Sequence, residues 1–103
     1  MEHRHEHRIA CSFDIELYRK NVMIGTAKVK NVSKNGLCIL TSLTLQNKEL
    51  IHTKFPEKAA QYGWPIIMRT IVLHIENDSI GLLFDGSIFN NLHDLQEACD
   101  EIS

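Results

Sequence analysis

The sequence predicts a small antiparallel β-barrel of six short strands followed by one C-terminal α-helix. Short apolar stretches of alternating polarity recur between residues 9 and 84, and turn residues separate them. The last segment instead spaces its apolar residues three or four apart, as an amphipathic helix does. A length of 103 residues with 44% hydrophobic and 23% charged residues indicates one globular domain. We expect residues 9–103 to form this domain and residues 1–8 to be a flexible N-terminal segment.

The first two strands are predicted to form a hairpin. Every second residue in the first stretch is apolar, which indicates a strand with one buried face: Ile9, Cys11, Phe13, Ile15 and Leu17. A polar turn at Arg19, Lys20 and Asn21 precedes the apolar run Val22–Val29. The inward residues Val29 and Val32 are three apart, so a bulge or turn is expected at Lys30–Asn31.

Shorter strands follow at Leu37–Thr41 and around Glu49–Lys54. The segment Phe55–Pro65 contains two prolines and Gly63, and it predicts a connecting loop with room for one helical turn. Ile66–Ile75 and Ile80–Phe84 predict a second hairpin. The final helix is expected over about 87–102, with the hydroxyl of Ser87 as its N-cap. Such a set of strands favours closure into a barrel, which leaves few exposed edges.

Charge and apolar length exclude several classes of partner. The formal net charge is −2 and the isoelectric point is near 6.3, so no overall positive field favours binding to a nucleic acid polymer. The longest apolar runs fall far short of the ~20 residues that a membrane helix requires. The charged start of the chain is unlike a secretory signal. Cys11, Cys38 and Cys99 are expected to be reduced core residues without a nearby partner, in a cytoplasmic protein.

Two short motifs stand out against this background. Arg4 and Arg8 are four residues apart just before the first strand, and Asn31-Val32-Ser33-Lys34-Asn35-Gly36 lies at the predicted bulge. In order and separation they resemble the PilZ signature, an Arg-x-x-x-Arg segment followed by Asp/Asn-x-Ser-x-x-Gly. The strand order, the Ile80–Phe84 strand and the final helix also resemble the PilZ family, so the resemblance covers nearly the whole chain.

The resemblance implies a small barrel that binds cyclic di-GMP on its outer surface. The implied ligand residues are Arg4, Arg8, Asn31, Ser33 and Gly36. Their chemistry suits the ligand, because guanidinium groups pair with phosphate and with the O6 and N7 acceptors of guanine. An amide, a hydroxyl and a close backbone approach complete such a site. If Ile80, Leu82 and Phe84 point inward, Gly81 faces outward beside His74, whose ring can stack on guanine. No cofactor is expected apart from this ligand.

We expect a receptor whose N-terminal arginine segment closes over the nucleotide and presents a new surface to an unidentified protein partner. One alternative is a PilZ adaptor that binds pilus or flagellar machinery without a ligand. Another is a metal-binding module that uses His3, His5 and His7. Catalytic motifs such as Gly-x-Ser-x-Gly and His-Glu-x-x-His are absent from the sequence, so enzymatic activity is not expected.

Overall fold

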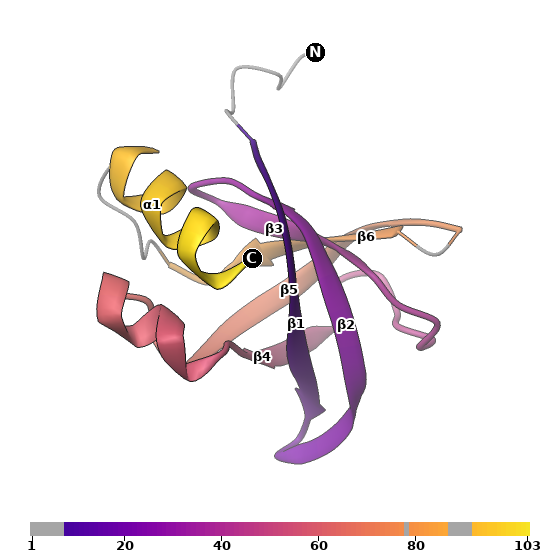
Figure 1. The fold of residues 1–103 in the computed structure, drawn as a ribbon. Helices are drawn as coiled ribbons and strands as arrows, with labels where there is room; N and C mark the ends of the chain where they lie inside the picture. Colours follow the sequence, from indigo (N-terminus) through magenta and orange to yellow (C-terminus); the bar gives the residue numbers. More distant parts are fainter. Residues whose placement is uncertain (1–7, 78, 87–91) are drawn as a thin grey trace.

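A computed structural model describes residues 8–77, 79–86 and 92–103, and it confirms the predicted fold class. Six antiparallel strands form a closed barrel in the order β1-β2-β3-β6-β5-β4 (Figure 1). Each strand therefore has a hydrogen-bonded neighbour on both sides, although β1 and β4 pair only over Glu16–Tyr18 and His52–Lys54. The strands are β1 (Ile9–Arg19), β2 (Val22–Val32), β3 (Gly36–Leu40), β4 (Leu50–Lys54), β5 (Ile67–Glu76) and β6 (Ser79–Phe84). A 3-10 helix, η1 (Glu57–Tyr62), and an α-helix, α1 (Leu92–Ile102), complete the fold.

The barrel interior is filled by the apolar residues that alternate along the strands. Phe13, Ile15 and Leu17 of β1 are buried, as are Ile80, Leu82 and Phe84 of β6, in agreement with the predicted parity. Phe13 and Phe55 pack on the ring of Trp64, with ring centroids 5.9 and 5.1 Å away. Because the inward face is set by period two, the residues between these positions point to the outer surface.

Two departures from regular pairing shape β2. The β1–β2 hairpin turns through Lys20 and Asn21, which have φ angles of 52° and 67°. Two such residues in succession form the tight turn that matches the twist of a hairpin. The pairing of β2 with β3 shifts register between Val29 and Asn31, so the bulge predicted at Lys30–Asn31 is confirmed. This bulge lets Val29 and Val32 both face the core while Asn31 stays on the outside.

The C-terminal helix packs against β1 and η1 (Figure 1). Leu95, Ala98 and Cys99 are buried on its inner face, as the predicted spacing requires. The predicted N-cap Ser87 lies outside the described residues. Cys99 is a buried free cysteine of α1, and Cys11 of β1 is a partly buried one.

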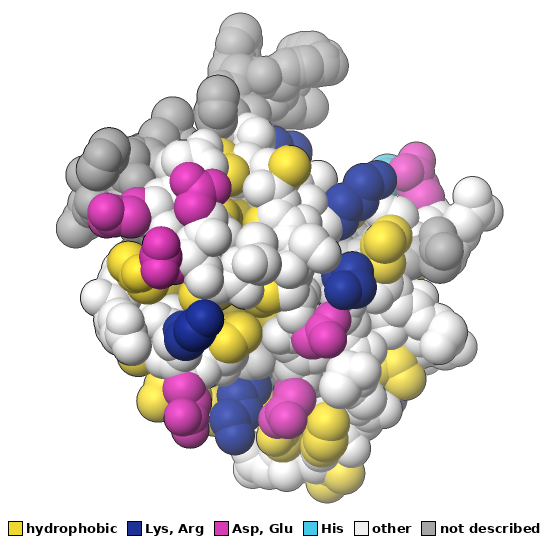
Figure 2. Space-filling view, viewed as in Figure 1, with side chains coloured by type: hydrophobic (Ala, Val, Ile, Leu, Met, Phe, Trp, Pro, Cys, Tyr) yellow, Lys and Arg dark blue, Asp and Glu magenta, His cyan; other side chains and the backbone are white. Residues whose placement is uncertain are grey.

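The surface around β1 and β2 mixes charges of both signs. Lys and Arg side chains alternate there with Asp and Glu (Figure 2). Nζ of Lys28 lies 3.5 Å from Oδ1 of Asp14, and Nζ of Lys54 lies 4.0 Å from Oε1 of Glu16. Such interspersed charges produce little net field over this face. Among the residues that the structure describes, none of the helices combines the length and apolar character that crossing a bilayer demands.

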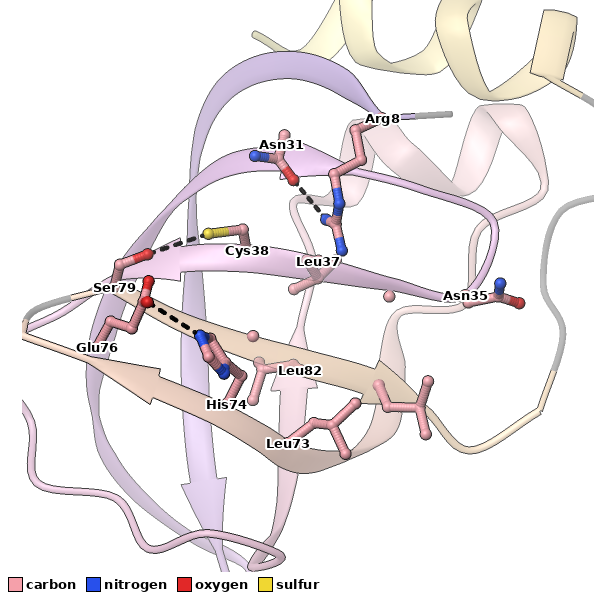
Figure 3. Close-up of a pocket in the computed structure, with 13 residues that line it drawn as sticks. Arg8, Asn31, Asn35, Leu37, Cys38, Leu73, His74, Glu76, Ser79 and Leu82 are labelled. Carbon is pink, nitrogen blue, oxygen red and sulfur yellow. Dashed lines mark hydrogen bonds and ion pairs between the residues drawn. The ribbon is translucent and has the colours of Figure 1, made fainter. Parts of the chain in front are cut away.

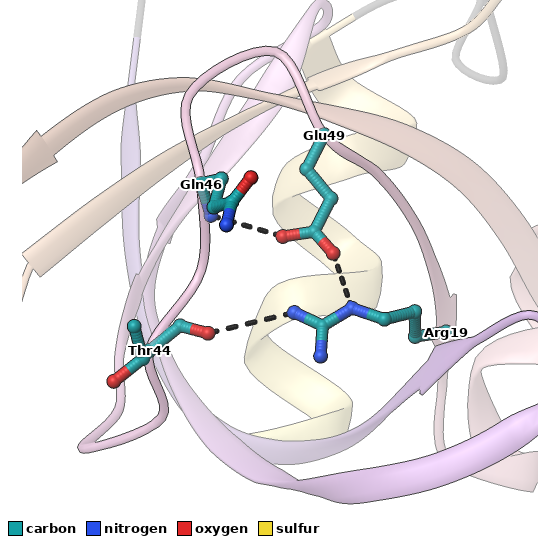
Figure 4. Close-up of polar contacts among 4 residues, drawn as sticks. All are labelled: Arg19, Thr44, Gln46 and Glu49. Atoms are coloured by element: carbon teal, nitrogen blue, oxygen red, sulfur yellow. Dashed lines mark hydrogen bonds and ion pairs between the residues drawn. The ribbon is translucent and has the colours of Figure 1, made fainter.

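An ion pair fastens the loop between β3 and β4 to the end of β1. The Arg19 guanidinium donates to the Glu49 carboxylate and to the carbonyl oxygen of Thr44, and the backbone N–H of Gln46 also donates to Glu49 (Figure 4). The hydrogen bond from Arg19 lowers the pKa of Glu49, and the one from Gln46 adds to the effect. A lowered pKa means that the charged carboxylate stabilises the folded state.

Glu49→Gln is therefore expected to lower the melting temperature by a few degrees at pH 7. The pKa of Glu49 is lower in the folded than in the unfolded chain. The carboxylate therefore stabilises the folded state fully above the unfolded pKa of about 4.3, and this stabilisation is lost as the pH falls through the folded pKa. Thermal melts from pH 7 to pH 3 should show the difference from wild type shrinking toward zero. Asp14→Asn removes a more exposed ion pair and should change the melting temperature little. A pH-independent difference for Glu49→Gln would contradict this account.

Candidate functional site

A pocket of about 290 Å³ lies on the outer surface of the barrel, where the start of β1 meets β2, β3, β5 and β6. Arg8 and Asn31 face each other on one side of it, and His74 and Glu76 lie on the other (Figure 3). Gly36 and Gly81 also line it, so five of the residues predicted from the two motifs and their surroundings meet here. The complete lining is Arg8, Asn31, Asn35, Gly36, Leu37, Cys38, Leu73, His74, Glu76, Ser79, Gly81, Leu82 and Leu83.

The two sequence motifs are joined by a direct hydrogen bond. Nη1 of Arg8 donates to Oδ1 of Asn31 over 2.7 Å, although the residues are 23 apart in the sequence. The contact follows from the β1–β2 register, in which Ala10 pairs with Asn31 and so places Arg8 close by. The bulge at Lys30 keeps the Asn31 side chain on the outer face. Arg4, the other predicted arginine, lies outside the described residues.

Ser33 organises the turn between β2 and β3. Its side chain is fully buried, and its Oγ accepts hydrogen bonds from the backbone N–H groups of Asn35 and Gly36, each over 3.2 Å. The backbone N–H of Ser33 donates to the carbonyl oxygen of Gly36 over 2.8 Å. Ser33 does not line the pocket. The structure therefore places this hydroxyl beneath the site, where it shapes the turn that carries Asn35 and Gly36.

Ser33→Ala is expected to reduce the free energy of unfolding by about 1–3 kcal/mol, because two backbone N–H groups near the buried hydroxyl lose their acceptor. Urea denaturation measures the difference. The exposed Ser12 offers a matched control, since Ser12→Ala removes a hydroxyl from the surface and should change stability by less than about 0.5 kcal/mol. Equal stabilities of Ser33→Ala and wild type would show that the turn does not depend on this hydroxyl.

The two glycines allow close approach in different ways. A Cβ atom on Gly36 would lie 2.0 Å from the carbonyl oxygen of Leu82 in β6, so a side chain there is incompatible with the β3–β6 pairing. A Cβ atom on Gly81 would lie 3.4 Å from the Cβ of His74, which is ordinary contact. Gly81 pairs with Cys38 on one side and His74 on the other. It therefore leaves a flat stretch of outer surface, as predicted from its parity.

His74 lies next to a carboxylate that the sequence analysis did not single out. Nε2 of His74 is 3.3 Å from Oε2 of Glu76, and about two-thirds of each side chain is exposed (65% and 67%). A register shift between Val72 and His74 places Leu73 as an extra residue in β5, and both Leu73 and His74 are exposed. The pocket thus combines a cation at Arg8, a carboxylate at Glu76 and an apolar surface at Leu73.

Sequence reasoning also missed Cys38, Ser79 and Leu83. Sγ of Cys38 lies 3.2 Å from Oγ of Ser79 across the β3–β6 pair. A signal exists for Leu83, which occupies an outward position of the strand whose inward residues Ile80, Leu82 and Phe84 were predicted. Cys38 was expected in the core, but it is only partly buried and lines the pocket on the outer surface. What the sequence lacked was the register that places Cys38 beside Gly81.

Titratable side chains give no second candidate within the part of the chain that the structure describes. There, no three His, Cys, Asp or Glu side chains are grouped as a metal site would require. The suggested metal ligands His3, His5 and His7 lie outside the described residues.

Comparison with known families gives one match over nearly the whole chain. The model of the PilZ domain matches residues 2–101, a range that includes both motifs, all six strands and most of the final helix. A search of curated proteins gave no match.

Proposed function

The chain belongs to the PilZ domain family, and on that basis we propose that it is a receptor for cyclic di-GMP that binds the nucleotide in the pocket on the outer surface of the barrel. PilZ domains are binding domains and not a known catalytic family. The observation that carries the proposal is the hydrogen bond between Arg8 and Asn31, which brings the two motifs together at one edge of this pocket.

The polar groups of the pocket match the chemistry of the ligand. Cyclic di-GMP presents phosphate oxygens and the acceptor edge of guanine, and a guanidinium group pairs with either through two parallel N–H bonds. Arg8 supplies this group, and Asn31 adds an amide that both donates and accepts. Because Asn31 already orients Arg8, less side-chain entropy is lost on binding than for an unrestrained arginine.

The floor of the pocket suits the flat face of a base. Gly81 adds no side chain between Cys38 and His74, and His74 offers a ring on which guanine can stack. Leu73 and Leu83 contribute apolar surface beside it. Ser33 supports this floor from below through the turn that precedes β3.

On binding, residues 1–8 would close over the nucleotide, and Arg4 would add a second guanidinium. Small-molecule sites usually have volumes of ~300–1,000 Å³, and the pocket lies at the lower limit with about 290 Å³. A ligand of two nucleotides therefore extends beyond the pocket and gains contacts if a further segment covers it. Fixing that segment costs about 1–2 kcal/mol per residue, which the arginine contacts must exceed. The closed form would present the new surface to a protein partner in the cytoplasm.

Isothermal titration of the full chain with cyclic di-GMP tests the proposed function. We expect saturable binding of cyclic di-GMP and at least tenfold weaker binding of cyclic di-AMP, because adenine replaces the O6 acceptor of guanine with an amino donor. Repeating the titration with a chelator separates nucleotide binding from a metal module, since only the latter depends on metal. Absence of heat with cyclic di-GMP at millimolar concentration would refute the receptor function.

The adaptor function is a second candidate because apolar side chains are exposed next to the pocket. Leu73, Ile75 and Leu83 on β5 and β6 have exposed fractions of 54%, 42% and 37%. Neighbouring apolar side chains of this kind are common at protein interfaces. An adaptor would bind its partner equally well with and without cyclic di-GMP, whereas the proposed receptor would bind it differently in the two conditions.

A further inference from the structure

A carboxylate lies across the candidate nucleotide pocket from Arg8. Glu76 of β5 lines the pocket next to His74, and Figure 3 shows both on the side opposite Arg8 and Asn31. Among the described residues that line the pocket, Glu76 is the only one with a carboxylate. A carboxylate repels the phosphates of an anionic ligand, and it can only accept hydrogen bonds. Its place in this pocket therefore indicates that the ligand brings hydrogen-bond donors to this side.

Strand register places Glu76 beside the flat floor of the pocket. In the β5–β6 pairing, His74 lies opposite Gly81 and Glu76 lies opposite Ser79. His74 and Glu76 are two residues apart, so they project from the same face of β5. Residues two apart on a strand are separated by about 7 Å, a length close to half a purine base and one hydrogen bond. Because strand side chains stand roughly perpendicular to the sheet, the Glu76 carboxylate can reach the level of a base that lies on Gly81.

The contact with His74 orients the Glu76 carboxylate and leaves it accessible. Nε2 of His74 lies 3.3 Å from Oε2 of Glu76, and both side chains are largely exposed. Each carboxylate oxygen accepts about two hydrogen bonds, so both oxygens can still accept from a ligand. Exposed ion pairs contribute little to stability. Glu76 is therefore a side chain that a ligand can reach and that can be replaced without unfolding the barrel.

The two sides of the pocket suit different parts of the ligand. The guanidinium group of Arg8 only donates hydrogen bonds, and the amide oxygen of Asn31 already accepts one from Arg8 over 2.7 Å. That side therefore attracts acceptors such as phosphate oxygens, whereas Glu76 attracts donors. The donors of cyclic di-GMP are its ribose hydroxyls and the N1–H and N2–H groups of guanine. Only the N1–H and N2–H groups stand side by side, as the two oxygens of a carboxylate do.

We propose that Glu76 determines the base specificity of the pocket by accepting hydrogen bonds from N1–H and N2–H of guanine. This inference rests on the proposed receptor function and adds a specificity-determining residue to it. With this edge of the base at Glu76, the ring that carries the sugar points back across the pocket, and the phosphates lie toward Arg8. Adenine would instead direct a ring nitrogen acceptor at the carboxylate, and two acceptors that face each other repel.

Isothermal titration of the full chain with two cyclic dinucleotides tests the role of Glu76. Cyclic di-IMP keeps the N1–H, O6 and N7 groups of guanine but lacks the N2 amino group. We expect the wild type to bind cyclic di-GMP about tenfold more tightly than cyclic di-IMP, because one charge-assisted hydrogen bond is missing. In Glu76→Ala the two affinities should agree within about threefold. Loss of the negative charge affects the attraction of both ligands equally, so the ratio of affinities reports only the contact with the base.

Two control variants separate this contact from other effects. Asp14→Ala removes an exposed carboxylate that does not line the pocket, and it should keep the wild-type ratio of affinities. Arg8→Ala should weaken the binding of both ligands and also keep the ratio, because guanine and the base of cyclic di-IMP share the O6 and N7 acceptors that an arginine contacts. The melting temperature of Glu76→Ala should stay close to that of the wild type.

The outcomes distinguish a failure of this inference from a failure of the receptor function. A wild type that binds both ligands equally, or a ratio that is the same in Glu76→Ala and in the wild type, would overturn the role of Glu76 and leave the receptor function standing. A wild type that does not bind cyclic di-GMP would refute the receptor function and, with it, the role of Glu76.

Discussion

Replacing Arg8 with alanine is expected to weaken the binding of cyclic di-GMP by about 10- to 100-fold. Arg8 is the guanidinium at the edge of the pocket, and a hydrogen bond to a charged group contributes about 1.5–3 kcal/mol. The substitution also removes the partner of Asn31, whose amide would lose its orientation. Isothermal titration measures the change, and it should appear with little loss of stability because Arg8 lies before the first strand.

Arg69→Ala is the matched control for Arg8→Ala. Arg69 is also an exposed arginine, but its Nη2 lies 2.5 Å from Oδ2 of Asp85 and it does not line the pocket. Its removal changes the net charge by the same amount, so any general electrostatic attraction of the ligand falls equally in the two variants. Equal affinities of the two variants would show that Arg8 acts only through net charge and would refute a specific contact.

Gly36→Ala is expected to lower the free energy of unfolding by at least about 3 kcal/mol, and the melting temperature by more than about 10 °C. The added methyl group would lie 2.0 Å from the carbonyl oxygen of Leu82. Rotation of a side chain cannot relieve a contact between a Cβ atom and a backbone atom, so β3 and β6 must separate. Their separation would break ladder hydrogen bonds and open the floor of the pocket.

Gly81→Ala tests whether this effect is specific to Gly36. The two glycines lie on paired strands and line the same pocket, but a Cβ atom on Gly81 meets only the Cβ of His74 at 3.4 Å. The stability of Gly81→Ala should stay within about 1 kcal/mol of wild type. Its methyl group would stand on the flat floor, so nucleotide affinity should fall while the fold persists. Similar destabilisation in both variants, measured by urea denaturation, would contradict the role given to the β3–β6 approach.

Much of the fold was predictable because it depends on local patterns in the sequence. The alternation in β1 and β6 identified the inward residues correctly, and the three-residue step from Val29 to Val32 located the bulge. The polar turn at Lys20 and Asn21 and the helical turn near Glu57 were also placed correctly. Each of these features depends on residues close together in the sequence. The described part of the last helix, Leu92–Ile102, agrees with the predicted range as far as it reaches.

The candidate site was only partly predictable, because it depends on contacts between residues that are far apart in the sequence. The motifs selected Arg8, Asn31 and Gly36, and strand parity selected Gly81; the structure gathers all four at one pocket. Ser33 belongs to the same motif, yet its hydroxyl is buried in the turn, because hydrogen bonding to nearby N–H groups satisfies it there. Glu76 and Cys38 carry no motif, and they join the pocket through strand register alone.

By itself the sequence determined the family, the strands, the residues that face the core and the two motifs, since hydrophobic period and turn chemistry act over a few residues. Only the tertiary structure decided which outward side chains become neighbours. Strand pairing within the barrel sets the Arg8–Asn31 contact between β1 and β2 and the tight approach of β3 to β6 at Gly36. Those contacts depend on register and packing between distant segments, which no local pattern specifies.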